Sequence, residues 1–176
     1  VSVFVFGPMG TWKTSWAATW PSPYFFSVGA EGGDDAIYTA CQMWQLPVPP
    51  IRRILMTKQL MDELHSLVQN YKAWGIKTAV VDSLSFLSDL WIAERLAAKI
   101  KQQAAGAKYQ DGVAMVMRDW GLLSNFFKYI QMTLQKTELN VIWTSLAKEK
   151  YSKPDSDGSR SLLGVVPCIQ GETAVK

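Results

Sequence analysis

Cysteine, histidine and long apolar runs are scarce in this chain of 176 residues. The two cysteines, Cys41 and Cys168, lie far apart and lack the spacing of a metal site, so we expect free thiols in a reducing compartment. The single histidine, His65, falls within a predicted helix beside Leu64 and Leu67, which favours a surface or boundary role over a catalytic one. No uninterrupted apolar run reaches about 18 residues, so we expect no membrane span.

The composition is that of a globular protein, with 48% hydrophobic and 19% charged residues. The length suits one domain, residues 1–176, with a sizeable core. The first residues read as a core strand rather than a signal peptide, so we expect a cytoplasmic protein. Several tryptophans fall in apolar stretches and are expected in the core: Trp16, Trp20, Trp44, Trp91 and Trp143.

Predicted strands alternate with predicted helices along the chain, which indicates an α/β fold with a mostly parallel central sheet flanked by helices. We expect strands at 2–6, 24–28, 51–56, 77–82, 139–145 and 162–166. We expect helices at 13–19, 34–44, 58–74, 83–105 and 117–136. The polar stretch 147–161 is expected to be a loop.

A phosphate-binding loop is predicted directly after the first strand, because its sequence follows the pattern GxxxxGK[ST] except at one position. In this pattern the Lys13 ammonium reaches the β- and γ-phosphates, and the Thr14 hydroxyl ligates Mg²⁺. Trp12 occupies the position of the second glycine. The predicted nucleotide-binding residues are Gly7, Pro8, Met9, Gly10, Thr11, Trp12, Lys13, Thr14 and Ser15.

The effect of Trp12 depends on its backbone conformation. If the loop requires a positive φ there, a residue with a Cβ costs about 1–2 kcal/mol. If the loop requires only a helical φ, the indole points away from the nucleotide. Two other interpretations stay open at this point: a degenerate loop that does not hydrolyse nucleotide, and an ordinary Gly-Pro turn before a helix.

Polar residues at the ends of later strands extend the predicted site. Asp82 ends an apolar strand, where an aspartate holds the Mg²⁺ shell or caps the next helix. Glu31 follows the second strand between flexible glycines, where a carboxylate faces the ligand crevice as a candidate base. Thr144 or Ser145 would present a hydroxyl to the γ-phosphate if their strand lies between the first strand and the Asp82 strand.

Together the strings GPMGTWKT, GAEGG, TAVVDSLSFL and VIWTSL resemble the core of RecA-like P-loop ATPases, most closely compact phage proteins of single-strand annealing and recombination. The resemblance implies ATP and Mg²⁺ as ligands, with Lys13, Thr14 and Asp82 binding them and Glu31 as the catalytic base. It also implies a sensor at Thr144 or Ser145, and head-to-tail homo-oligomers. The residues after Thr144 offer neither the glutamine nor the histidine that this group carries near that strand.

In RecA-like proteins, the loops after the aspartate strand and after the sensor strand face single-stranded DNA. The first of these regions offers Arg95, Lys99, Lys101, Lys108 and Tyr109. The second offers the predicted DNA-binding residues Lys148, Lys150, Tyr151, Lys153 and Arg160. Lysines that neutralise phosphates and an aromatic ring that stacks on a base suit a single strand, although solvated surface charges would give the same sequence.

The sequence therefore predicts a DNA-stimulated ATPase that acts on single-stranded DNA in recombination or replication. The first alternative is a nucleotide-binding scaffold without turnover, because of Trp12. The second is a small P-loop kinase, which would need an arginine-rich lid, whereas the arginines here cluster only at Arg52 and Arg53. A motor subunit of helicase or packaging type is a further possibility.

Overall fold

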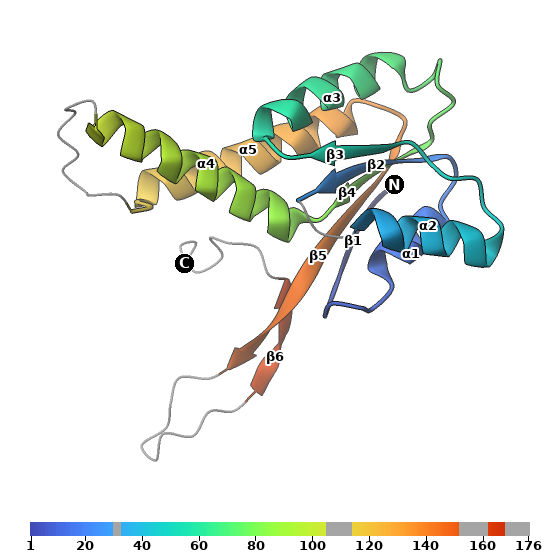
Figure 1. Ribbon diagram of the computed structural model, residues 1–176, viewed down its shortest axis with the longest axis horizontal. Coiled ribbons are helices and arrows are strands. Elements are labelled where there is room, and N and C mark those ends of the chain that lie inside the picture. Colours follow the sequence, from blue (N-terminus) through green and yellow to red (C-terminus); the bar gives the residue numbers. More distant parts are fainter. Residues whose placement is uncertain (30–32, 105–113, 152–161, 168–176) are drawn as a thin grey trace.

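The computed structural model describes residues 1–29, 33–104, 114–151 and 162–167. Five parallel strands form the central sheet in the order β1-β5-β4-β2-β3 (Figure 1). Their bounds are β1 Ser2–Gly7, β2 Pro23–Val28, β3 Ile51–Ile54, β4 Thr78–Asp82 and β5 Asn140–Tyr151. The sixth strand, β6 Leu162–Pro167, pairs antiparallel with the end of β5 that extends beyond the sheet.

Helices cover both faces of the sheet, which confirms the predicted α/β fold with a mostly parallel sheet. The helices are α1 Lys13–Ala18, α2 Gly33–Trp44, α3 Thr57–Asn70, α4 Leu84–Ala104 and α5 Met117–Gln135. Phe25, Val80 and Ile142 face the side of α1 and α2. Their neighbours Val81 and Trp143 face the side of α3, α4 and α5. Burial on both faces explains why the inner strands are almost uninterrupted apolar runs.

β5 lies between β1 and β4, as the sensor-strand hypothesis required. One edge of β5 pairs with β1, from Ser2↔Val141 to Gly7↔Leu146. The other edge of β5 pairs with β4, and this pairing ends at Val81↔Trp143. Because the strands are parallel, the ends of β1, β4 and β5 meet at the same edge of the sheet. The residues that follow β1, β2 and β4 therefore gather there.

Two expectations are wrong, one about the length of β5 and one about the burial of the tryptophans. Residues 147–151 belong to β5 rather than to a loop, because β6 supplies an antiparallel hydrogen-bonding partner for them. Of the tryptophans expected in the core, only Trp143 is buried, whereas Trp16 and Trp44 are 39% and 41% exposed. Trp20 and Trp91 are partly buried. Trp16 and Trp44 lie on helices that cover the sheet from outside, so one side of each helix faces solvent.

None of the helices in the described part of the chain combines the length and apolar character that crossing a membrane requires.

Candidate functional site at the carboxyl edge of the sheet

The chain leaves β1 through a tight loop in which Gly7 lies against the side chain of Thr11. A Cβ on Gly7 would lie 2.8 Å from Thr11 Oγ1, so the Thr11 hydroxyl would have to move to admit it. The Thr11 hydroxyl in turn donates a hydrogen bond of 2.8 Å to the Pro8 carbonyl. Gly10 has a φ of +78°, a conformation that glycine adopts without strain. The loop is thus folded back on itself by contacts within residues 7–12.

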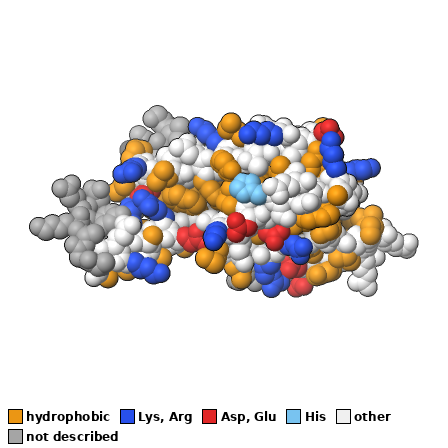
Figure 2. Space-filling view, turned by 90° about the horizontal axis from the view of Figure 1, so that it is seen from above, with side chains coloured by type: hydrophobic (Ala, Val, Ile, Leu, Met, Phe, Trp, Pro, Cys, Tyr) orange, Lys and Arg blue, Asp and Glu red, His pale blue; other side chains and the backbone are white. Residues whose placement is uncertain are grey.

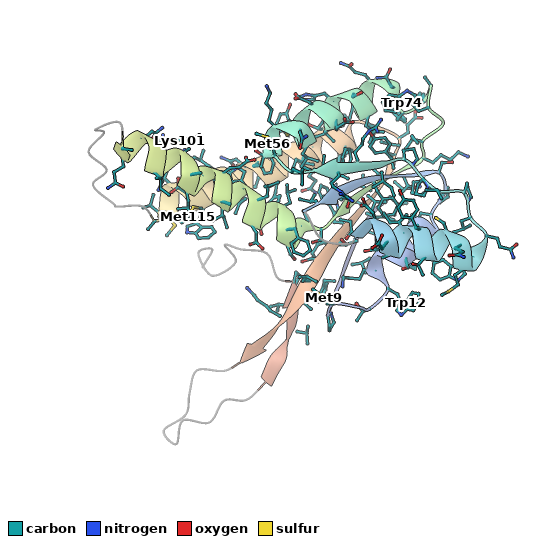
Figure 3. The ribbon with its side chains drawn as sticks, in the orientation of Figure 1. Met9, Trp12, Met56, Trp74, Lys101 and Met115 are labelled. Atoms are coloured by element: carbon teal, nitrogen blue, oxygen red, sulfur yellow. The ribbon has the colours of Figure 1, made fainter. Side chains whose placement is uncertain are left out.

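Trp12 takes up the left-handed conformation, with φ 61° and ψ 17°. Its carbonyl accepts a hydrogen bond of 2.8 Å from the Trp16 N–H and so begins α1. The residue is 55% exposed, and Figure 3 shows it below α1 in this view and away from α4. The backbone therefore has the conformation that a glycine would adopt here, at a cost to tryptophan of about 1–2 kcal/mol.

Lys13 is folded over the loop that precedes it. Its ammonium donates hydrogen bonds to the Gly7 carbonyl at 2.9 Å and to the Pro8 carbonyl at 2.7 Å. Burial lowers the pKa of Lys13 below its ordinary value of 10.5, and the carboxylate of Asp82 opposes this effect. The ammonium thus lies between the loop and the acidic end of β4.

Asp82 connects α1 with β5 through its two carboxylate oxygens. The Thr14 hydroxyl donates to Oδ2 at 2.7 Å, and the Thr144 hydroxyl donates to Oδ1. Thr144 is fully buried, so its hydroxyl is held in this direction by the surrounding structure. The three residues come from distant parts of the chain and bring one carboxylate and two hydroxyl groups together near Lys13.

The two sensor candidates have different surroundings. Thr144 contacts Asp82, whereas the Ser145 hydroxyl lies 3.0 Å from Ser85 Oγ on α4. Successive residues of a strand point to opposite faces, which separates the two side chains. Among the described residues, Thr144 is the member of this pair that hydrogen-bonds to Asp82, the predicted Mg²⁺ ligand.

A pocket of about 560 Å³ opens beside these residues. It lies among the loop, α2 and the first turn of α4. The predicted residues that line it are Met9, Gly10, Thr11, Trp12, Lys13, Thr14, Ser15 and Asp82. The predictions missed the other residues in its wall: Ser27, Val28, Gly33, Ala36, Thr39, Ser83, Phe86 and Leu146. Ser27 is paired with Asp82 in the sheet, and such a position at a strand end is a signal that would have found it.

The start of α2 is held next to this pocket by a partly buried carboxylate. Arg53 on β3 donates a hydrogen bond of 2.6 Å to Asp34 in the first turn of α2. Burial alone would raise the pKa of Asp34, but hydrogen bonds from Ser27 and Arg53 hold it below its usual value. A Cβ on Gly33 would lie 3.4 Å from Ser27 Oγ, so α2 begins in close contact with β2. Glu31, the predicted base, lies in this connection but outside the described residues.

The predicted DNA-binding residues lie on β5, on α4 or outside the described residues. Lys148 is exposed on β5, and Lys150 and Tyr151 follow it on the same strand. Lys153 and Arg160 lie outside the described residues, as do Lys108 and Tyr109.

Two basic residues of α4, Arg95 and Lys99, bind a carboxylate of α5 instead, whereas Lys101 on the same helix is exposed. The Arg95 guanidinium and the Lys99 ammonium contact opposite oxygens of Asp119, at 2.8 Å and 2.5 Å. Lys99 is only 2% exposed, so the expectation that it faces DNA is wrong. Figure 2 shows another face of the molecule, on which acidic and basic side chains are interspersed with hydrophobic ones.

Sequence comparisons place the chain in a family. No curated protein matches it. A family model described as an AAA domain matches residues 1–175, which is nearly the whole chain. This match agrees with the mostly parallel sheet and with the loop between β1 and α1. It supports nucleotide binding and ATPase activity for the domain. The chain therefore belongs to the AAA domain family of P-loop nucleoside triphosphatases.

Proposed function

We propose that this chain binds ATP with Mg²⁺ and hydrolyses the nucleotide, with residues 1–176 acting as one ATPase domain. The observation that carries the proposal is the contact of Asp82 with both Thr14 and Thr144, next to the ammonium of Lys13. We further propose that the protein acts on single-stranded DNA as a homo-oligomer, in recombination or replication of the phage type. This finer part rests on the sequence resemblance and on the position of Lys148.

The residues at the site fit a magnesium–triphosphate group. Hydroxyl and carboxylate oxygens are the ligands that Mg²⁺ prefers, and Thr14 and Asp82 supply one of each. Gly7 and the Thr11 hydroxyl lie in close contact, as expected of a loop that closes tightly around an anion. Trp12 keeps the left-handed backbone conformation of a glycine, so its indole does not prevent the loop from folding. When bound, Mg²⁺ would neutralise charge on the phosphates as it builds up during transfer.

The chain's own residues would do the remaining work by binding and orienting the phosphates. The Lys13 ammonium would exchange its contacts with the Gly7 and Pro8 carbonyls for phosphate oxygens. The Thr144 hydroxyl would keep the Asp82 carboxylate turned toward Thr14. Glu31 would orient the attacking water, as the sequence pattern predicts.

A lysine variant tests the nucleotide site. Lys13→Ala should abolish ATP binding measured by calorimetry, because the loop then lacks the positive charge that faces the phosphates. Lys58→Ala removes an exposed lysine at the start of α3 and serves as the matched control. ATP affinity in Lys13→Ala equal to that of the parent would show that the site is assigned wrongly.

A second candidate function is favoured by Trp12, whose Cβ occupies a position where the pattern has none. In that case the chain binds nucleotide without turnover and acts as a scaffold. Release of inorganic phosphate distinguishes the two functions when it is measured with and without a short DNA strand. Binding of ATP without release of phosphate in either condition would favour the scaffold.

A further inference from the structure

At residues 144–147, β5 leaves the central sheet and enters its antiparallel pairing with β6, which we call the β5–β6 ribbon. Its pairing with β4 ends at Val81↔Trp143, whereas its pairing with β6 begins at Ala147↔Pro167. Thr144, which contacts Asp82, lies within this crossing. Beyond Trp143, the edge of β5 that pairs with β4 therefore needs a contact with another element.

Ser85 in the first turn of α4 makes that contact. The Leu146 N–H donates a hydrogen bond of 2.9 Å to Ser85 Oγ, and Ser145 Oγ lies 3.0 Å from the same atom. The Ser145 hydroxyl is also 3.0 Å from the Leu146 carbonyl. These contacts allow both hydroxyl groups to donate a hydrogen bond: Ser85 donates to Ser145, and Ser145 donates to the Leu146 carbonyl.

The contact is buried and lies close to the candidate site. Ser85 is 3% exposed and Ser145 is fully buried, so water does not readily replace either hydroxyl. Leu146 itself lines the pocket, and Thr144 lies two positions before it on the same face of the strand. A shift of Leu146 would therefore move the Thr144 hydroxyl relative to Asp82.

We propose that Ser85 is a positioning residue for ATP hydrolysis that acts through β5. It holds Leu146 by its backbone N–H and thereby keeps Thr144 at hydrogen-bonding distance from Asp82. This inference rests on the proposed hydrolysis of ATP at the site. The hydrogen bonds of Ser85 within the described structure go to Ser145, Leu146 and Ser88 rather than to the loop 7–14, so its effect should fall on turnover rather than on binding.

Three variants test this role by their kcat and KM for ATP. Ser85→Ala should lower kcat about tenfold, the effect of one lost hydrogen bond to a buried group, with KM nearly unchanged. Ser85→Thr keeps the hydroxyl and should recover most of kcat. Ser88→Ala is the control, because Ser88 is buried on the same helix and donates to the Ser85 carbonyl within that helix. Its kcat should stay near that of the parent.

Hydrogen exchange of the Leu146 amide in the nucleotide-free protein gives a second measurement that needs no turnover. Exchange should be faster in Ser85→Ala than in the parent or in Ser88→Ala. Equal exchange in the parent and Ser85→Ala overturns the inference, as does an unchanged kcat or an equal loss of kcat in both alanine variants. A parent that releases no phosphate overturns the proposed hydrolysis instead, and the exchange measurement then decides whether Ser85 holds β5.

Discussion

Asp119 provides a quantitative test of the structure outside the pocket. This residue of α5 is 1% exposed and accepts hydrogen bonds from Arg95 and Lys99 of α4. It also accepts a hydrogen bond of 3.0 Å from the Val116 N–H at the start of its own helix. One carboxylate thus joins the second half of α4 to the beginning of α5.

The pKa of Asp119 gives the expected size of its effect. Burial alone would raise this pKa, but hydrogen bonds from Lys99, Val116 and Arg95 lower it from 3.8 to about 2. That difference corresponds to about 2 kcal/mol of folding free energy. Because the folded chain binds this proton less tightly than the unfolded chain, the stabilisation is complete above pH 3.8 and is lost as the pH falls through about 2.

Asp119→Asn should cost more than this, about 3–5 kcal/mol at pH 7, because it leaves the ammonium of Lys99 buried without its counter-charge. Urea denaturation at pH 7 measures the loss in the free energy of unfolding. Asp89→Asn is the matched control, since Asp89 is exposed on α4, and it should change stability by less than about 0.5 kcal/mol. A loss below about 1 kcal/mol in Asp119→Asn would refute the reasoning, given the known range for buried pairs.

Further predictions concern the nucleotide site and the β5–β6 ribbon. Trp12→Gly should tighten ATP binding severalfold in a calorimetric titration, because the strained residue and its Cβ are removed; weaker binding would show that the indole helps to hold the nucleotide. Thr144→Val keeps the shape of the side chain but removes the donor to Asp82, and should lower kcat about tenfold; an unchanged kcat would exclude Thr144 from the site. Lys148→Ala should weaken binding of single-stranded DNA and reduce its dependence on salt by about one unit of slope, whereas an unchanged slope would remove Lys148 from the interface.

Local patterns along the chain were sufficient to predict the fold class and the position of the loop between β1 and α1. The alternation of apolar strands with amphipathic helices predicted the parallel sheet, because a sheet buried on both faces requires apolar side chains on both. The spacing of Gly7, Lys13 and Thr14 predicted the loop, since a short turn between a strand and a helix is determined by neighbouring residues. The position of Asp82 at the end of a strand was also predictable, because an apolar run precedes it in the sequence.

Contacts between distant segments were decided only by the tertiary structure. The left-handed conformation of Trp12 was one of two possibilities that the sequence left open, and packing in the loop selected it. Nothing near Ser85 in the sequence indicates Leu146, because β5 must first lie beside β4 and α4. The charges of Arg95 and Lys99 looked available for DNA until Asp119, on another helix, was placed against them. Sequence patterns report interactions between near neighbours, whereas these contacts depend on how the helices and strands pack together.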